Sequence, residues 1–150
     1  MGKIKDNSIF IDTNVLIYAN VVESPLHRIA INAIEYYYKE DYDLWINRQV
    51  LREYLAVMTR PNFFKNIKPA KILIKRIQYF QNNFMVADND QFVTDMLLEL
   101  ITKVSVGGKQ IHDANIVSTM LVNGIGKILT HNVDDFKRFS DYINIEPLIK

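Results

Sequence analysis

Four acidic residues, Asp12, Glu53, Asp113 and Asp135, lie where the chain is expected to pass from a strand or a glycine break into a helix. Carboxylates that converge raise one another's pKa, so a cluster of them is unfavourable unless a divalent cation compensates the charge. Oxygen ligands suit Mg²⁺ or Mn²⁺, and Mg²⁺ keeps several waters that a substrate phosphate can replace. If the four side chains meet, the chemistry implied is metal-dependent hydrolysis of a phosphodiester.

Other metal chemistry is excluded by residue type. The chain has no cysteine, so it contains neither a disulfide framework nor a thiolate zinc site. Its three histidines, His27, His112 and His131, do not have the spacing of a two-histidine metal motif. The absence of cysteine fits a reducing compartment, and no stretch approaches the roughly 20 apolar residues that cross a bilayer. We therefore expect a cytoplasmic protein with no membrane segment.

Length and composition predict one domain that spans residues 1–150, because 150 residues with 49% apolar content suffice for one core. The net charge of +1 argues against a protein that coats nucleic acid. Residues 48–76 nevertheless carry eight basic residues and a single acidic one, Glu53. This segment either faces phosphates or is a solvated helical surface, and both interpretations stay open.

Short apolar runs alternate with helical periodicity along the chain. Strands are expected at residues 8–11, 44–46, 84–87 and 127–130, with an edge strand at 143–145. Helices are expected over 25–40, from a cap at Asn47 to a stop at Pro61, over 90–104, and over 111–122 with a stop at Gly124. Another helix is expected from Pro69 onward, with Ile72, Leu73, Ile77 and Phe80 facing inward. Asn132 is expected to cap a short helix over 134–139.

The alternation of strands and helices predicts the α/β class. The architecture expected is a three-layer sandwich with a mostly parallel sheet of four or five strands, flanked by helices. Ligands of such sheets bind beyond the carboxyl ends of the strands, where helix N-termini also point. The four acids are expected at that edge.

Four blocks of the sequence resemble the motifs of PIN domains. The first is Ile-Phe-Ile-Asp-Thr-Asn-Val-Leu-Ile-Tyr at residues 9–18, and the others are Gln-Val-Leu-Arg-Glu-Tyr at 49–54, His-Asp-Ala at 112–114 and Leu-Thr-His-Asn-Val-Asp-Asp-Phe at 129–136. Their order and approximate spacing agree with the family over nearly the whole chain. Within the family, the sequence is most similar to VapC-like toxins of toxin–antitoxin pairs.

The resemblance implies a PIN-like endoribonuclease that depends on Mg²⁺ or Mn²⁺. It assigns the catalytic acids as Asp12, Glu53, Asp113 and Asp135, and three of them, Asp12, Asp113 and Asp135, as metal ligands. It assigns the polar support to Thr13, Asn14, Thr130 and Asn132. The partners implied are an RNA substrate, a small antitoxin protein and a second copy of the chain in a homodimer.

The fourth acid is ambiguous by one residue, because Asp134 precedes Asp135 directly. Asp135 is preferred because it immediately precedes Phe136, as in the family pattern. Asn132 matches a position where the family has Asp or Asn, so it is also expected to help place the metal.

Each acid taken alone also has a purely structural interpretation. Asp12 alone would cap a helix, Glu53 would be an exposed helix residue, and Asp113 would complement a helix dipole.

Two other protein classes, receiver domains and aspartyl phosphatases, also have an acid after their first strand. However, Asn14 stands where the phosphatase needs a second acid, and a receiver has no counterpart of Glu53. The alternatives left open are a solitary RNA-processing PIN nuclease and a non-catalytic PIN module that binds RNA or protein.

Overall fold

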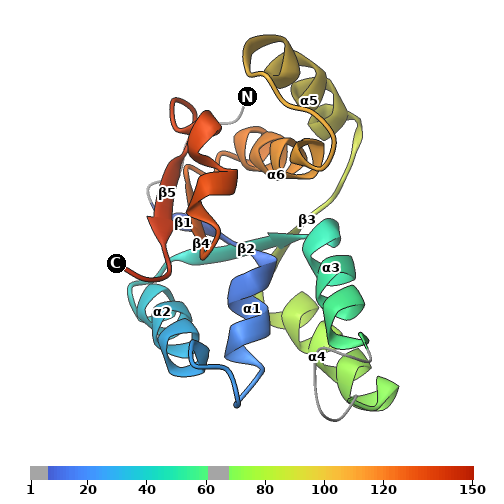
Figure 1. The fold of residues 1–150 in the computed structure, drawn as a ribbon, viewed down its shortest axis with the longest axis vertical. Coiled ribbons are helices and arrows are strands. Elements are labelled where there is room, and N and C mark those ends of the chain that lie inside the picture. The colour runs from blue at the N-terminus through green and yellow to red at the C-terminus, as the bar shows by residue number, and fades with distance from the viewer. Residues whose placement is uncertain (1–6, 61–67) are drawn as a thin grey trace.

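A five-stranded parallel sheet forms the middle layer of the structure (Figure 1). The computed structural model describes residues 7–60 and 68–150. The strands are β1 (Ser8–Ile11), β2 (Asp43–Asn47), β3 (Met85–Ala87), β4 (Lys127–Thr130) and β5 (Asn144–Pro147). Their order across the sheet is β3-β2-β1-β4-β5, and every neighbouring pair is parallel. The predicted α/β sandwich is confirmed, with five strands.

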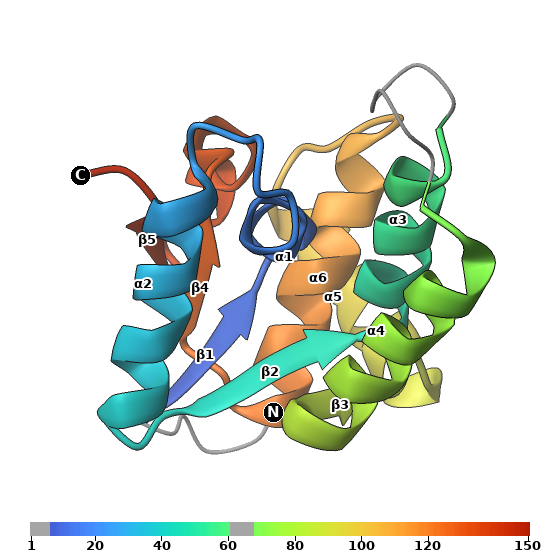
Figure 2. The ribbon, with the colours of Figure 1, turned by 90° about the horizontal axis from the view of Figure 1, so that it is seen from below.

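Helices cover both faces of the sheet (Figures 1 and 2). Four helices lie on one side: α1 (Thr13–Ala19), α2 (His27–Lys39), α3 (Arg48–Met58) and α4 (Ala70–Asn83). On the other side lie α5 (Gln91–Lys103) and α6 (Gln110–Asn123). The chain moves from β1 to β2 to β3 in one direction and then crosses back to β4, so right-handed crossovers place the two groups of helices on opposite faces.

The core is centred on the middle strand, β1, and its neighbour β2. Ile9, Phe10 and Ile11 of β1 are fully buried, as expected for a strand covered on both faces. Trp45 of β2 is only 8% exposed, as its predicted strand position indicates. Among the described residues, no helix is both long and apolar enough to cross a membrane.

Local signals set several helix ends as predicted. Asn47 Oδ1 accepts a hydrogen bond from the Val50 backbone N at 2.9 Å and so caps α3. Gly124 ends α6 with a φ of 70°, a left-handed conformation that glycine adopts without steric cost. Helix α3 ends at Met58, and Pro61, the predicted stop, lies outside the described residues.

Two details of the prediction are wrong. In place of one helix over 134–139, the chain forms two short 3₁₀ turns, η1 (Val133–Asp135) and η2 (Lys137–Phe139), and the side chain of Asn132 makes no capping hydrogen bond. Phe136 and Phe139 are both buried, and this three-residue spacing suits a 3₁₀ turn. Ile72 was expected to face inward but is 41% exposed, whereas Leu73 and Phe80 of α4, which were expected to face inward with it, are buried.

Candidate active site

The carboxyl ends of β1 and β4 form the switch point of the sheet. From β1 the chain leads to β2 on one side, whereas β4 pairs with β1 on the other side. The Asp12 backbone N donates to the Leu129 carbonyl at 3.0 Å, so Asp12 lies directly beside the end of β4. Ligands of open parallel sheets bind at such points. The first predicted acid therefore lies at the expected edge.

Asp12 is a buried carboxylate held by three donors. Its Oδ2 accepts from Thr130 Oγ1 at 2.7 Å and from Asn14 Nδ2 at 3.2 Å. Its Oδ1 accepts from the Thr13 backbone N at 2.8 Å, so Asp12 also caps α1. Burial and, to a smaller extent, the charge of Glu53 raise the pKa of Asp12 to about 6, although the three donors lower it. The side chain is only 7% exposed.

Thr130 and Asn14 connect β4 to α1. Thr130 Oγ1 accepts from the Asn132 backbone N at 3.0 Å and lies 3.4 Å from Asn14 Nδ2. Asn14 Oδ1 accepts from the His131 backbone N at 3.1 Å. Two residues assigned as polar support thus lie around Asp12, whereas Asn132 contributes its backbone N–H and its side chain is exposed.

Replacement of the Thr130 hydroxyl gives a first testable prediction. Thr130→Val removes one donor from buried Asp12 and the acceptor of the Asn132 N–H, and should lower the free energy of unfolding by about 1 kcal/mol. Thr119→Val is the matched control, because within the described part of the chain the Thr119 hydroxyl bonds only to the Asn115 carbonyl of its own helix. Urea unfolding measures both variants. Equal destabilisation would show that Asp12 does not depend on Thr130.

Glu53 lies in the second turn of α3 with both oxygens engaged. Its Oε2 accepts from Thr13 Oγ1 at 2.8 Å, and its Oε1 accepts from Gln49 Nε2 at 2.8 Å. Thr13 therefore supports two acids: Asp12 through its backbone N and Glu53 through its hydroxyl. Residues 40 positions apart in the sequence meet here.

Asp113 lies in the first turn of α6 and is coupled to the other three acids. Burial, together with the charges of Asp135, Asp12 and Glu53, raises the pKa of Asp113 to about 7, although Arg138 lowers it. Asp134 is not among these groups; it is exposed and forms an ion pair with Lys137 at 2.6 Å. Asp135, and not Asp134, is the η1 acid whose charge acts on Asp113.

Asp12 after β1, Glu53 on α3, Asp113 on α6 and Asp135 in η1 thus come from four separate elements, and the charges of the other three raise the pKa of Asp113. The family model of the PIN domain matches residues 9–142. The chain belongs to the PIN domain family.

Solved structures with the same fold include components of toxin–antitoxin complexes. VapBC2 from Rickettsia felis, bound to a promoter DNA fragment, has 19% identity and a TM-score of 0.68, with 93% of this chain and 98% of that chain covered. A toxin–antitoxin complex from Klebsiella pneumoniae has 16% identity and a TM-score of 0.67, with 95% and 98% covered. VapC20 of Mycobacterium tuberculosis, a toxin that cleaves the sarcin-ricin loop, has 13% identity and a TM-score of 0.63, with 93% and 99% covered. No curated protein matches the chain by sequence.

The donor set of this PIN domain suits a hard divalent cation. Its acids are oxygen ligands whose mutual repulsion a cation would relieve. Within residues 7–60 and 68–150, no group of three or more His, Asp or Glu side chains could hold a metal ion as the side chains stand. Mg²⁺, however, is usually bound by one or two carboxylates together with water and substrate phosphate. The residues therefore fit a Mg²⁺ or Mn²⁺ site that substrate completes.

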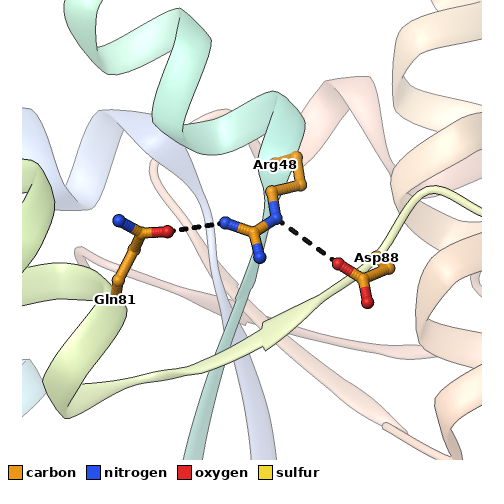
Figure 3. Close-up of polar contacts among 3 residues, drawn as sticks. All are labelled: Arg48, Gln81 and Asp88. Atoms are coloured by element: carbon orange, nitrogen blue, oxygen red, sulfur yellow. Dashed lines mark hydrogen bonds and ion pairs between the residues drawn. The ribbon is translucent and has the colours of Figure 1, made fainter.

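Arg48, the first residue of α3 in this PIN domain, is held by side chains from two other segments (Figure 3). Its Nη1 donates to Gln81 Oε1 at 2.7 Å on α4, and its Nε lies 3.4 Å from Asp88 Oδ1, after β3. Arg48 and Asp88 are both exposed, so the ion pair contributes at most about 1 kcal/mol. Arg48 thus connects the start of α3, next to Gln49, to α4 and to the segment after β3.

Sequence reasoning missed three residues near the acids of the PIN domain. Gln49 and Asn115 form hydrogen bonds with each other, and Gln49 also bonds to Glu53. Arg138 is the cation whose charge acts on Asp113, and its Nη1 donates to the Ser105 carbonyl at 3.2 Å. The one available signal was that Gln49 precedes Glu53 by four residues, the spacing at which helical side chains meet.

Proposed function

We propose that this PIN domain is an endoribonuclease dependent on Mg²⁺ or Mn²⁺, with Asp12, Glu53, Asp113 and Asp135 as its catalytic acids. One observation carries the proposal: the charges of three acids from separate elements all raise the pKa of the fourth, Asp113. A fold gains no stability from such repulsion, so the cluster points to a function that needs it. The same cluster does not suit a module that only binds RNA or protein.

The roles of the residues follow from their environments. Asp12, Asp113 and Asp135 would hold the cation, one or two of them directly and the rest through its bound waters, with Thr130 and Asn14 fixing the orientation of Asp12. A bound divalent cation supplies a water of lowered pKa and positive charge beside the scissile phosphate. Thr13 and Gln49 orient Glu53, and one carboxylate of the cluster takes the proton of the attacking water as general base. The products expected are a 5′-phosphate and a 3′-hydroxyl.

The decisive experiment is cleavage of end-labelled structured and single-stranded RNAs by the purified chain. Cleavage should require Mg²⁺ or Mn²⁺, stop with EDTA and return when the metal is restored. Asp12→Asn, prepared in parallel, should be inactive, which excludes a contaminating nuclease. Activity that is indifferent to EDTA and to this substitution would refute the metal mechanism.

We further propose that the enzyme is the toxin of a toxin–antitoxin pair and acts as a cytoplasmic homodimer. The fold similarity to structures of toxin–antitoxin complexes supports the antitoxin partner. A groove of about 430 Å³ between α1, α2 and α4 supports it as well, since its walls are mainly apolar. Its lining includes Leu16, Ile31, Ile34, Ile72, Tyr79 and Phe80.

The partner proposal separates a toxin from a solitary RNA-processing nuclease. The product of a short reading frame adjacent to the gene should copurify with the chain and suppress its RNA cleavage. Sedimentation of the chain alone measures whether it is a dimer. If no neighbouring product binds, the enzyme is better described as a solitary nuclease.

A further inference from the structure

We propose that Gln49 is a positioning residue that sets the Glu53 carboxylate and couples it to the first turn of α6; this inference rests on the proposed nuclease function. Gln49 lies on α3, one turn before Glu53, and is only 9% exposed. None of the family motifs quoted above gives it a role. Its side-chain amide nevertheless connects two of the elements that carry the acids.

Both ends of the Gln49 amide are used. Its Nε2 donates to Glu53 Oε1 at 2.8 Å and approaches the His112 carbonyl at 3.4 Å. Its Oε1 accepts from Asn115 Nδ2 at 3.3 Å. His112 precedes Asp113 directly, so the same side chain contacts Glu53 and the backbone beside Asp113. The bond to Asn115 joins residues that are 66 positions apart.

The donor and acceptor in each of these hydrogen bonds follow from the chemistry of the Glu53 carboxylate. The Glu53 carboxylate can only accept, so Gln49 must present Nε2 to it and leave Oε1 free for Asn115. Asn115 must then donate, and its Nδ2 also lies 3.5 Å from Asn89 Oδ1, in the segment between β3 and α5. A carboxylate at position 49 would face Glu53 as a like charge, and a hydrocarbon would offer no donor.

Loss of the Gln49 bond would leave Glu53 with a single donor, Thr13 Oγ1. The carboxylate could then rotate about its last side-chain torsion, which is broad for glutamate. Displacements of about 1 Å in an active site cost up to 10²-fold in rate, although substrate binding need not change. A positioning role therefore predicts a loss in kcat with an unchanged KM.

The principal variants are Gln49→Met, which keeps an unbranched side chain but has no amide, and Asn115→Leu, which removes the partner of Gln49 Oε1. The control is Asn123→Leu, since among the described residues Asn123 Nδ2 bonds only to the Thr119 carbonyl at the far end of α6. Gln49→Met should lower kcat for RNA cleavage by at least about tenfold, with KM within twofold of wild type. Asn115→Leu should give a smaller loss, and the control should match wild type.

A double variant tests whether Gln49 acts through Glu53. In Glu53→Gln, whose residual cleavage is measured at high enzyme concentration, adding Gln49→Met should cause no further loss, because both residues act through one carboxylate. An additional tenfold loss in that background would overturn the positioning role. Unchanged kcat in Gln49→Met, with impaired Glu53→Gln, would overturn it too. If instead wild type shows no metal-dependent cleavage, or Glu53→Gln matches wild type, the proposed function fails.

A readout independent of activity uses the side-chain amide signals of Gln49 in a ¹H–¹⁵N spectrum. Glu53→Gln should shift the signal of the Nε2 proton that bonds to Glu53, because its acceptor loses its charge, and Asn123→Leu should leave that signal in place. If the Gln49 amide signals do not shift in Glu53→Gln, the hydrogen bond between Gln49 and Glu53 does not exist in solution. Thermal unfolding of each variant confirms that it is folded, and Asn115→Leu serves if Gln49→Met does not fold.

Discussion

Asp113→Asn and Asp135→Asn are each expected to lower the rate of RNA cleavage by roughly 10²–10³-fold, the usual cost of removing one group that stabilises developing charge in an active site. Asp113 is where the cluster is most strongly coupled, since burial and the charges of the other three acids raise its pKa to about 7. Asp135 is the first named of those charges. Each substitution removes one anionic ligand while keeping the size of the side chain.

The adjacent acid provides the matched control. Asp134 is exposed and paired with Lys137, so Asp134→Asn should cleave RNA within twofold of wild type. Initial rates under single-turnover conditions, with Mg²⁺ titrated for each variant, measure the three substitutions on the same scale. A large loss in Asp134→Asn with a normal rate in Asp135→Asn would mean that the fourth acid has been assigned to the wrong residue.

The same substitution, Asp113→Asn, should make the metal-free protein more stable at pH 8. A shift of the pKa of Asp113 from 3.8 to about 7 corresponds to a free-energy cost of about 4 kcal/mol for keeping the group charged in the folded state. Because the group is partly exposed, solvent screening reduces this to about 2 kcal/mol. For a chain of this size, that gain raises Tm by roughly 4–8 °C.

The pH dependence has a definite sign. The folded carboxyl group holds its proton up to about pH 7, whereas the unfolded one loses it near 3.8, so the folded state binds more protons between these values. Stability of the metal-free wild type therefore falls as pH rises through this window, because unfolding then releases protons. The Tm advantage of Asp113→Asn should be absent near pH 4 and complete above pH 8.

Thermal unfolding in EDTA at pH 4, 6 and 8 checks this prediction. Addition of Mg²⁺ at pH 8 should raise the Tm of wild type more than that of Asp113→Asn, since a ligand stabilises only a fold that binds it. A metal-free Asp113→Asn protein that is less stable than wild type at pH 8 would contradict the electrostatic account of the cluster.

Together these two expectations describe a site at which activity and stability oppose each other. Asp12 is compensated by three donors, and Glu53 by two. Asp113 makes no hydrogen bond through its side chain to the described residues, and the charge of Arg138 offsets only part of the effect of burial and of the three acids. Such an electrostatic cost is typical of functional sites, where a bound ligand compensates the charge.

Much of the fold was predictable from local patterns. The buried run of β1, the Asn47 cap of α3 and the glycine that ends α6 depend on residues close together in sequence, and the structure has them as expected. The location of Asp12 at the switch point was also predictable, because parallel strands place their carboxyl ends at one edge. Where the local pattern was short, as at 134–139, burial of Phe136 and Phe139 decided the outcome instead.

The sequence by itself determined which residues are acidic and, for Asp12, Glu53 and Asp113, the strand end or helix on which each one lies. Only the tertiary structure decided that Asp135 acts on Asp113 while Asp134 pairs with Lys137, and that Gln49 joins Glu53 to Asn115. The reason is physical: these contacts depend on how η1, α3 and α6 are rotated about their axes. Those rotations are set by the packing of buried side chains from distant parts of the chain, which no local periodicity records.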